Sequence, residues 1–130
     1  PELSCSNFQT SLTFYKDKLG FKIIYGRSEN GFACIALGHA QIMLEQSNGF
    51  WSTGELHKPY GRGINFQILV ENVESLYEYV INQGVPVFAH LETSWYRIDQ
   101  IEHGQSEFLV QDPDGYLLRF SEHLGERPVV

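Results

Sequence analysis

The feature that most constrains this chain is an internal repeat. The residues Ser11-Leu12, Tyr15 and Gly20 recur as Ser75-Leu76, Tyr79 and Gly84, each 64 positions later. A repeat of this length, with one helix and a few short strands in each copy, is typical of a duplicated unit, because a solenoid needs three or more copies to bury its faces. The spacing therefore predicts two similar halves that pack against each other. A second interpretation, two unrelated helices with similar ends, stays open on the spacing alone.

Both halves show the same order of elements. In the first half Asn7, Thr10 and Ser11 offer side-chain oxygens that can cap a helix, and Gly20 is typical of the residue that follows a helix end. In the second half Asn72 and Gly84 have these roles. Strands are expected at 3–6, 21–26, 32–37, 41–46, 63–70 and from 85 onward, residues 47–62 connect the halves, and residues 89–105 form an insertion.

A tight turn is expected at residues 112–115, Asp-Pro-Asp-Gly. Pro113 presets φ for a turn and Gly115 accepts a positive φ, so the apolar run that follows is the second arm of a β-hairpin whose first arm is 108–111. Arg119 occupies the third inward position of that second arm. A charged side chain at this place makes the site the most informative one in the chain.

Charge and length limit the classes of binding partner that are expected. The chain has 130 residues, a formal net charge of −7 and a pI near 5.1, and its nine Lys and Arg residues are scattered. Nucleic-acid binding needs clustered cations, so no nucleic acid is expected as a partner. A single domain that binds a cationic or neutral small molecule is the better prediction.

Cysteine use and hydropathy indicate the compartment. Cys5 and Cys34 are too few for a disulfide framework and lack the spacing of a zinc site, so both are expected to be buried free thiols in a cytoplasmic protein. No apolar run approaches the ~20 residues of a membrane span, and no charged and then apolar leader is visible. No membrane association is therefore predicted.

Several of these residues together resemble a known family. The segment Ser11-Leu12-Thr13-Phe14-Tyr15 with Leu19-Gly20-Phe21, followed 91 positions after Phe21 by the 112–115 turn, resembles the vicinal oxygen chelate superfamily, which includes glyoxalases and bleomycin resistance proteins. The resemblance covers nearly the whole chain. It implies an α+β fold of two βαβββ modules, about 1–62 and 63–127, whose curved mixed sheets surround a cavity, usually in a dimer.

The resemblance also implies where a metal would bind. Metal-dependent members hold a divalent ion with side chains from four positions, of which one falls before Pro1 and the others fall on Glu45, Asn65 and Arg119. A guanidinium has no lone pair and brings its own positive charge, so Arg119 opposes metal binding. No metal, no cofactor and no catalytic residue are therefore predicted. The alternative is a glyoxalase-like metal-dependent lyase, dioxygenase or thiol transferase of the same superfamily.

The string Asp-Pro-Asp-Gly-x-Leu-Leu-Arg is similar to that of bleomycin resistance proteins. The resemblance implies a homodimer that sequesters cationic, planar drugs in grooves at the subunit interface, with aromatic side chains stacked on the drug. Two tryptophans of those relatives are replaced here by Phe32 and His103, so another planar or cationic ligand is a further alternative. The candidate ligand-binding residues are Phe32, Glu45, Trp51, Tyr60, Asn65, Trp95, Tyr96, His103 and Arg119.

Several assignments among these candidates stay open. Trp51 and Trp95 stand in segments without a helix or strand period, and core packing or a dimer contact is the other interpretation of both. Arg119 is expected to pair with Glu45 across the space that a metal would fill, and the alternative for Glu45 is a solvated strand residue. The five histidines lack the i, i+2 or i, i+4 spacing of a metal site, and the alternative is a site assembled in space from His57, His103 and Glu45. The aromatic residues Phe14, Tyr15, Phe66 and Phe120 are assigned to the core or to the seam between the halves.

Overall fold

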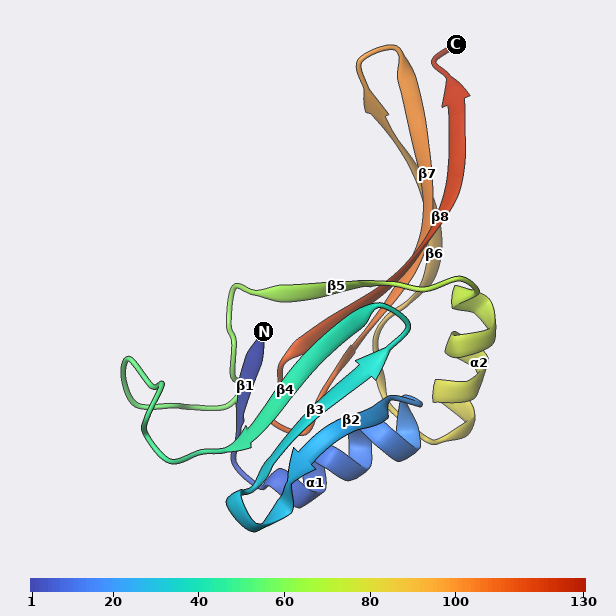
Figure 1. Ribbon diagram of the computed structural model, residues 1–130. Coiled ribbons are helices and arrows are strands. Elements are labelled where there is room, and N and C mark those ends of the chain that lie inside the picture. Colours follow the sequence, from blue (N-terminus) through green and yellow to red (C-terminus); the bar gives the residue numbers. More distant parts are fainter.

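The computed structural model describes all residues 1–130 and shows two four-stranded mixed sheets. Their strand orders are β1-β4-β3-β2 and β5-β8-β7-β6, which are the same order in the two halves (Figure 1). The predicted α+β fold of two βαβββ modules is confirmed. The elements are β1 (Glu2–Cys5), α1 (Phe8–Thr13), a π-helix (Phe14–Lys18), β2 (Lys22–Arg27), a 3₁₀ helix (Ser28–Asn30), β3 (Phe32–Leu37), β4 (Ala40–Gln46), β5 (Asn65–Leu69), α2 (Val73–Asn82), β6 (Val87–Ile98), β7 (Ile101–Gln111) and β8 (Leu117–Pro128).

The two modules match in register and in their helix caps. The outer strand of each module pairs in parallel with the last strand, Cys5 opposite Gln46 and Leu69 opposite Ser121. The first helical N–H group of each module donates to a side chain of that last strand, Phe8 to Gln46 Oε1 at 2.8 Å and Val73 to Glu122 Oε1 at 2.9 Å. The duplication therefore extends to individual hydrogen bonds.

The repeat at 64 positions is only partly right, because the first helix has one extra residue. The N-caps Asn7 and Asn72 lie 65 positions apart, whereas Gly20 and Gly84 lie 64 apart. The π-helix takes up this residue through a hydrogen bond from Leu19 N to Phe14 O at 3.2 Å. By place in the helix, the fully buried Tyr15 therefore corresponds to the fully buried Val80, while Tyr79 is 41% exposed.

A single apolar core lies between the helices and the sheets. Its largest fully buried side chains include Tyr15, Phe21, Phe108 and Phe120, and the rings of Tyr15 and Phe21 meet edge to face at 5.3 Å between centroids. Phe14 is buried and Phe66 is half-buried against this core, as predicted. The two cysteines are buried and unpaired, also as predicted.

The expected insertion at 89–105 is instead part of a long hairpin. β6 and β7 pair without interruption from Glu92 opposite Glu107 to Ile98 opposite Ile101, and their turn is at residues 99–100, where Asp99 has a positive φ of 56°. With β8 they run beyond the rest of the molecule, and the C-terminus lies at the tip (Figure 1). No helix combines the length and the apolar character that crossing a lipid bilayer requires.

Candidate functional site

The turn at residues 112–116 closes one junction between the modules. Asp112 Oδ1 accepts the backbone N–H groups of Asp114 and Tyr116 at 2.9 and 3.0 Å, while Oδ2 accepts the Tyr15 hydroxyl at 2.8 Å. Burial raises the pKa of Asp112 to about 6 and holds the pKa of Tyr15 well above its usual value. The carboxylate therefore links the last hairpin to the first helix.

Asp114 completes this junction from the other side of the turn. Its side chain is 1% exposed and accepts both the backbone N–H and the hydroxyl of Ser6, with Lys58 Nζ at 3.5 Å. Gly115 packs directly on the ring of Pro59. We call this contact between the 112–116 turn and the corner that joins β1 to α1 the closed junction.

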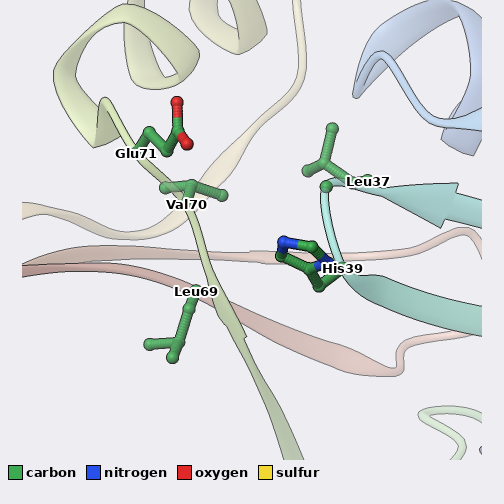
Figure 2. A pocket seen from close by; sticks show the side chains of 6 residues that line it. Leu37, His39, Leu69, Val70 and Glu71 are labelled. Atoms are coloured by element: carbon green, nitrogen blue, oxygen red, sulfur yellow. The ribbon is translucent and has the colours of Figure 1, made fainter.

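The equivalent junction on the other side of the repeat is open. Here the two-residue turn Gly38-His39 between β3 and β4 faces the corner that joins β5 to α2. A cavity of about 490 Å³ lies between them, and Figure 2 shows His39 and Leu37 on one side and Leu69, Val70 and Glu71 on the other. We call this the open junction.

The second sheet has one buried face and one polar face. Leu118 and Phe120 are fully buried, so the alternating side chains of β8 point away from the core. Cross-strand register places residues from all four strands beside them. This surface, called the polar face below, carries Gln67, Glu92, Tyr96, His103, Gln105, Glu107, Arg119, Ser121 and His123.

Glu107 is the centre of a hydrogen-bond network on the polar face. Its Oε2 atom accepts Gln105 Nε2 at 2.6 Å and the Ser121 hydroxyl at 2.9 Å, and Arg119 Nε lies 3.8 Å from the same oxygen. Gln67 Nε2 donates to Ser121 at 3.4 Å. Two side chains, from β7 and β8, therefore donate hydrogen bonds to one carboxylate, Arg119 lies beside it, and Gln67 of β5 supports Ser121.

The prediction that Arg119 pairs with Glu45 is wrong. Arg119 pairs with Glu107 of its own sheet, and Glu45 accepts Asn48 Nδ2 at 3.2 Å in the first module. The reason is the register of β7 and β8, which puts Glu107 on the strand next to Arg119.

A row of aromatic rings lies next to this network. The ring of His103 stacks on Tyr96 at 6.0 Å with an interplanar angle of 23°, and His123 lies 5.9 Å from His103 on its other side. Glu126 Oε1 is 3.7 Å from His103 Nδ1. Tyr96 and His103, both predicted ligand contacts, are thus brought together, and His123 joins them.

A small hollow of about 160 Å³ connects the network to the edge of the sheet. It is lined by Ala89, His90, Glu92, Ser94, Glu107 and Leu109. Glu92 is directly opposite Glu107 in the β6 and β7 register. Like charges that face each other across a sheet repel, so a cation between them would be favoured.

Trp95 lies on the opposite face from Tyr96. It covers Gly104, where an added Cβ atom would come within 2.6 Å of the indole, and the guanidinium of Arg127 lies 4.0 Å from the ring centroid. Successive strand residues point to opposite faces, so Trp95 and Tyr96 cannot contact one ligand on the polar face. The contact with Arg127 accounts for the position of Trp95.

The remaining predicted residues are spread over the first module and its connection. Phe32 is buried under Arg27, whose guanidinium is 4.3 Å from the ring centroid, and is directly opposite Glu45. Trp51 is 73% exposed in the connecting loop. Tyr60 packs on Tyr116 with ring centroids 5.8 Å apart.

The metal positions of the fold do not fit a metal here. Asn65 is exposed on β5, and Gln67, two residues further along the same strand, is the residue opposite Arg119. Glu45 lies on β4 of the other sheet. No group of three or more His, Cys, Asp or Glu side chains is close enough to hold an ion. A cation would also meet the guanidinium of Arg119, so we derive no metal-dependent step.

Sequence reasoning missed Glu107, Gln105 and His123. One signal was available, since His103, Gln105 and Glu107 alternate with Gly104, Ser106 and Phe108 at the strand period. That alternation places three polar side chains on one face of a strand. Extending the predicted strand from residue 108 back to residue 103 would have shown this alternation.

Comparisons with known proteins agree with this architecture. The model of the Glyoxalase/Bleomycin resistance protein/Dioxygenase superfamily matches residues 2–120. Proteins named "Bleomycin resistance protein" from Geobacillus stearothermophilus and Staphylococcus aureus are 28% identical over 137 aligned residues, which cover 95% of this chain and 95% of theirs.

Solved structures share the fold. TioX from Micromonospora sp. ML1 superposes with a TM-score of 0.74 at 17% identity, covering 95% of this chain and 96% of that one. A glyoxalase/bleomycin resistance protein/dioxygenase from Alicyclobacillus acidocaldarius superposes with a TM-score of 0.70 at 19% identity, covering 96% of this chain and 89% of that one. With the family match over most of its length, the chain belongs to the Glyoxalase/Bleomycin resistance protein/Dioxygenase superfamily.

Proposed function

We propose that this chain is a metal-independent protein that binds a planar, cationic drug of the bleomycin type and confers resistance by sequestering it. The observation that supports this most is the row of rings formed by Tyr96, His103 and His123 beside the Glu107 hollow. Flat rings and a held carboxylate on one surface are what a planar cation requires. The relatives named bleomycin resistance proteins point in the same direction.

The electrostatics of the polar face favour a cation. Glu92, Glu107 and Glu126 lie along it, and the whole chain carries −7. An acidic surface raises the local concentration of a cationic ligand and speeds its association. Stacking on Tyr96 and His103 would then hold the planar part without any chemical step.

We infer that the protein acts as a homodimer in the cytoplasm. The edge strand β2 is exposed along its length, and Ile23, Ile24 and Tyr25 are 44–50% exposed. Exposed apolar side chains on an edge strand favour pairing with a second copy, and we propose that the drug-binding groove lies at the interface between the two copies. The unpaired thiols Cys5 and Cys34 agree with a reducing compartment.

Calorimetric titration with metal-free bleomycin tests the proposal. Wild-type protein is expected to bind with saturable heat, and Tyr96→Ala and His103→Ala are expected to weaken binding about tenfold each, because each removes one stacking surface. Phe88→Ala is the control, because Phe88 is an exposed aromatic residue on β6, the strand that carries Tyr96. This variant should leave the affinity for bleomycin unchanged.

Two results would overturn the proposal. One is a folded wild-type protein that gives neither heat nor a shift in melting temperature with micromolar bleomycin. The other is about one equivalent of tightly held divalent metal per purified chain, which would favour the metal-dependent enzymes of the superfamily.

A further inference from the structure

The guanidinium of Arg119 has donors that the protein does not use. Its Nε atom is buried without a hydrogen-bond partner, and its closest charged neighbour is Glu107 Oε2 at 3.8 Å, which is too long for a hydrogen bond. The side chain is 32% exposed on the polar face. The buried Nε is out of reach of a ligand, but no hydrogen bond within the protein uses the two terminal nitrogens of this partly exposed guanidinium, so they can donate to an acceptor atom from outside the chain.

Glu107 has a carboxylate oxygen that accepts no hydrogen bond within the protein. Its two hydrogen bonds within the protein, from Gln105 and Ser121, and its ion pair with Arg119 are all made by Oε2. The side chain is 23% exposed and lines the 160 Å³ hollow, and no hydrogen bond involves Oε1. This oxygen is therefore an acceptor that the network positions but does not use.

An unused donor and an unused acceptor thus lie side by side. We propose that Arg119 and Glu107 together recognise a carboxamide-type edge of the ligand, in which a carbonyl oxygen accepts from Arg119 and the neighbouring N–H group donates to Glu107. This inference rests on the proposed function, since it assumes that a ligand occupies the polar face. It adds the chemical group that the ligand presents next to the planar part held by Tyr96 and His103.

The pairing of the two charges explains why an amide edge fits better than a single charge. A ligand carboxylate would be attracted by Arg119 but repelled by Glu107 and by Glu92 opposite it. An ammonium group would be attracted by these carboxylates but would leave the donors of Arg119 unused. A carbonyl next to an N–H satisfies both partners at once, as bidentate recognition requires.

Three probes that differ only in the polar group test this. The probes are 2-naphthamide, 2-naphthoate and 2-naphthylmethylammonium, titrated into ¹⁵N-labelled full-length protein while amide shifts of residues 103–107 and 119–123 are followed. We expect the amide to bind about tenfold more tightly than either charged probe, because each loses one charge-assisted hydrogen bond. Arg119→Gln should weaken amide binding about tenfold and leave the ammonium probe equal or tighter, whereas Glu107→Gln should weaken the ammonium probe most.

Arg97→Gln is the matched control. This variant also removes one positive charge, but from the face of β6 that lies opposite Tyr96. It should leave the ranking of the three probe affinities unchanged. If all probes bind at the ring row but the amide has no preference, or if Arg119→Gln changes no affinity, the amide assignment is overturned and the proposed function stands. If no probe and no bleomycin shifts these amides in the folded protein, the proposed function fails as well.

Discussion

The two junctions between the modules start from the same topology and end differently. In both, a turn between the third and fourth strands of one module faces the corner where the other module enters its helix. The five-residue turn from Asp112 to Tyr116 reaches that corner and bonds to it, whereas the two-residue turn Gly38-His39 leaves a cavity of about 490 Å³. Turn length, rather than strand order, thus decides where a duplicated fold is locked.

The two junctions also differ in whether their polar side chains are buried. The closed junction buries two carboxylates, Asp112 and Asp114, and supplies each with hydrogen-bond donors. At the open junction the polar side chains His39 and Glu71 stay exposed. We therefore expect the closed junction to carry most of the stability that joins the modules, and substitutions at matched positions can test this.

The largest effect is expected from the matched substitutions Gly115→Ala and Gly38→Ala. Both glycines have positive φ, 100° and 58°, but a Cβ at Gly115 would lie 2.6 Å from Pro59 Cα, while one at Gly38 meets nothing within 4 Å. Gly115→Ala should lower the free energy of unfolding by about 3 kcal/mol, and Gly38→Ala by about 1 kcal/mol. Denaturant melts of both variants give the comparison, and equal losses would show that the closed junction is not special.

A smaller loss is expected when a tyrosine hydroxyl is removed. Tyr15→Phe leaves Asp112 Oδ2 buried without its donor and should cost about 1–3 kcal/mol. Tyr79→Phe, the control on the other helix, removes only an exposed bond to Asp17 O and should cost less than about 1 kcal/mol. Thermal melts that rank Tyr79→Phe as the more damaging change would refute the assignment of the lock to the first helix.

The raised pKa of Asp112 predicts a dependence on pH. The folded state holds this proton up to a pKa of about 6, against 3.8 for the free side chain, so the folded state binds more protons than the unfolded state in that window. The contribution of Asp112 to stability is thus fully present below pH 4 and is lost as pH rises through 6. Relative to Asp112→Asn, the wild type should lose melting temperature between pH 4 and 6.5, and parallel curves for the two proteins would contradict this.

The smallest effect is expected at the open junction itself. His39 is exposed and forms no ion pair or side-chain hydrogen bond. His39→Ala should therefore change the free energy of unfolding by less than about 0.5 kcal/mol. A loss above about 2 kcal/mol in a denaturant melt would mean that the cavity is filled or bridged in solution.

Much of this fold could be predicted because local signals agree with it. Asn7 and Asn72 cap their helices through the side-chain oxygen, and β3 was predicted with its observed bounds from its apolar run. The projecting hairpin was missed because both of its faces meet solvent, so β6 lacks the apolar and polar alternation that reveals a half-buried strand. The extra residue of the first helix was missed because a π-helix leaves no mark in the composition of a short segment.

The site could be predicted only in part. The turn and the strand after it were predicted, with Arg119 at an inward position of the second arm, whereas Arg119 lies on the face away from the core because Leu118 and Phe120 flank it. Its partner Glu107 lies one residue before the predicted first arm at 108–111, so the pair becomes visible only when that strand is known to begin earlier. The register of β7 against β8 brings His103 and His123 together, and neither spacing nor composition signals that contact.

The position of Trp95 has a practical consequence for optical experiments. One indole of this chain is held against Arg127 on the back of the hairpin, and the other, Trp51, is exposed in a distant loop. Intrinsic emission therefore reports on two places where no drug is expected, and a silent fluorescence titration would say nothing about occupancy. A Tyr96→Trp reporter in a Trp95→Phe background would place an indole on the polar face, where the drug is expected to bind.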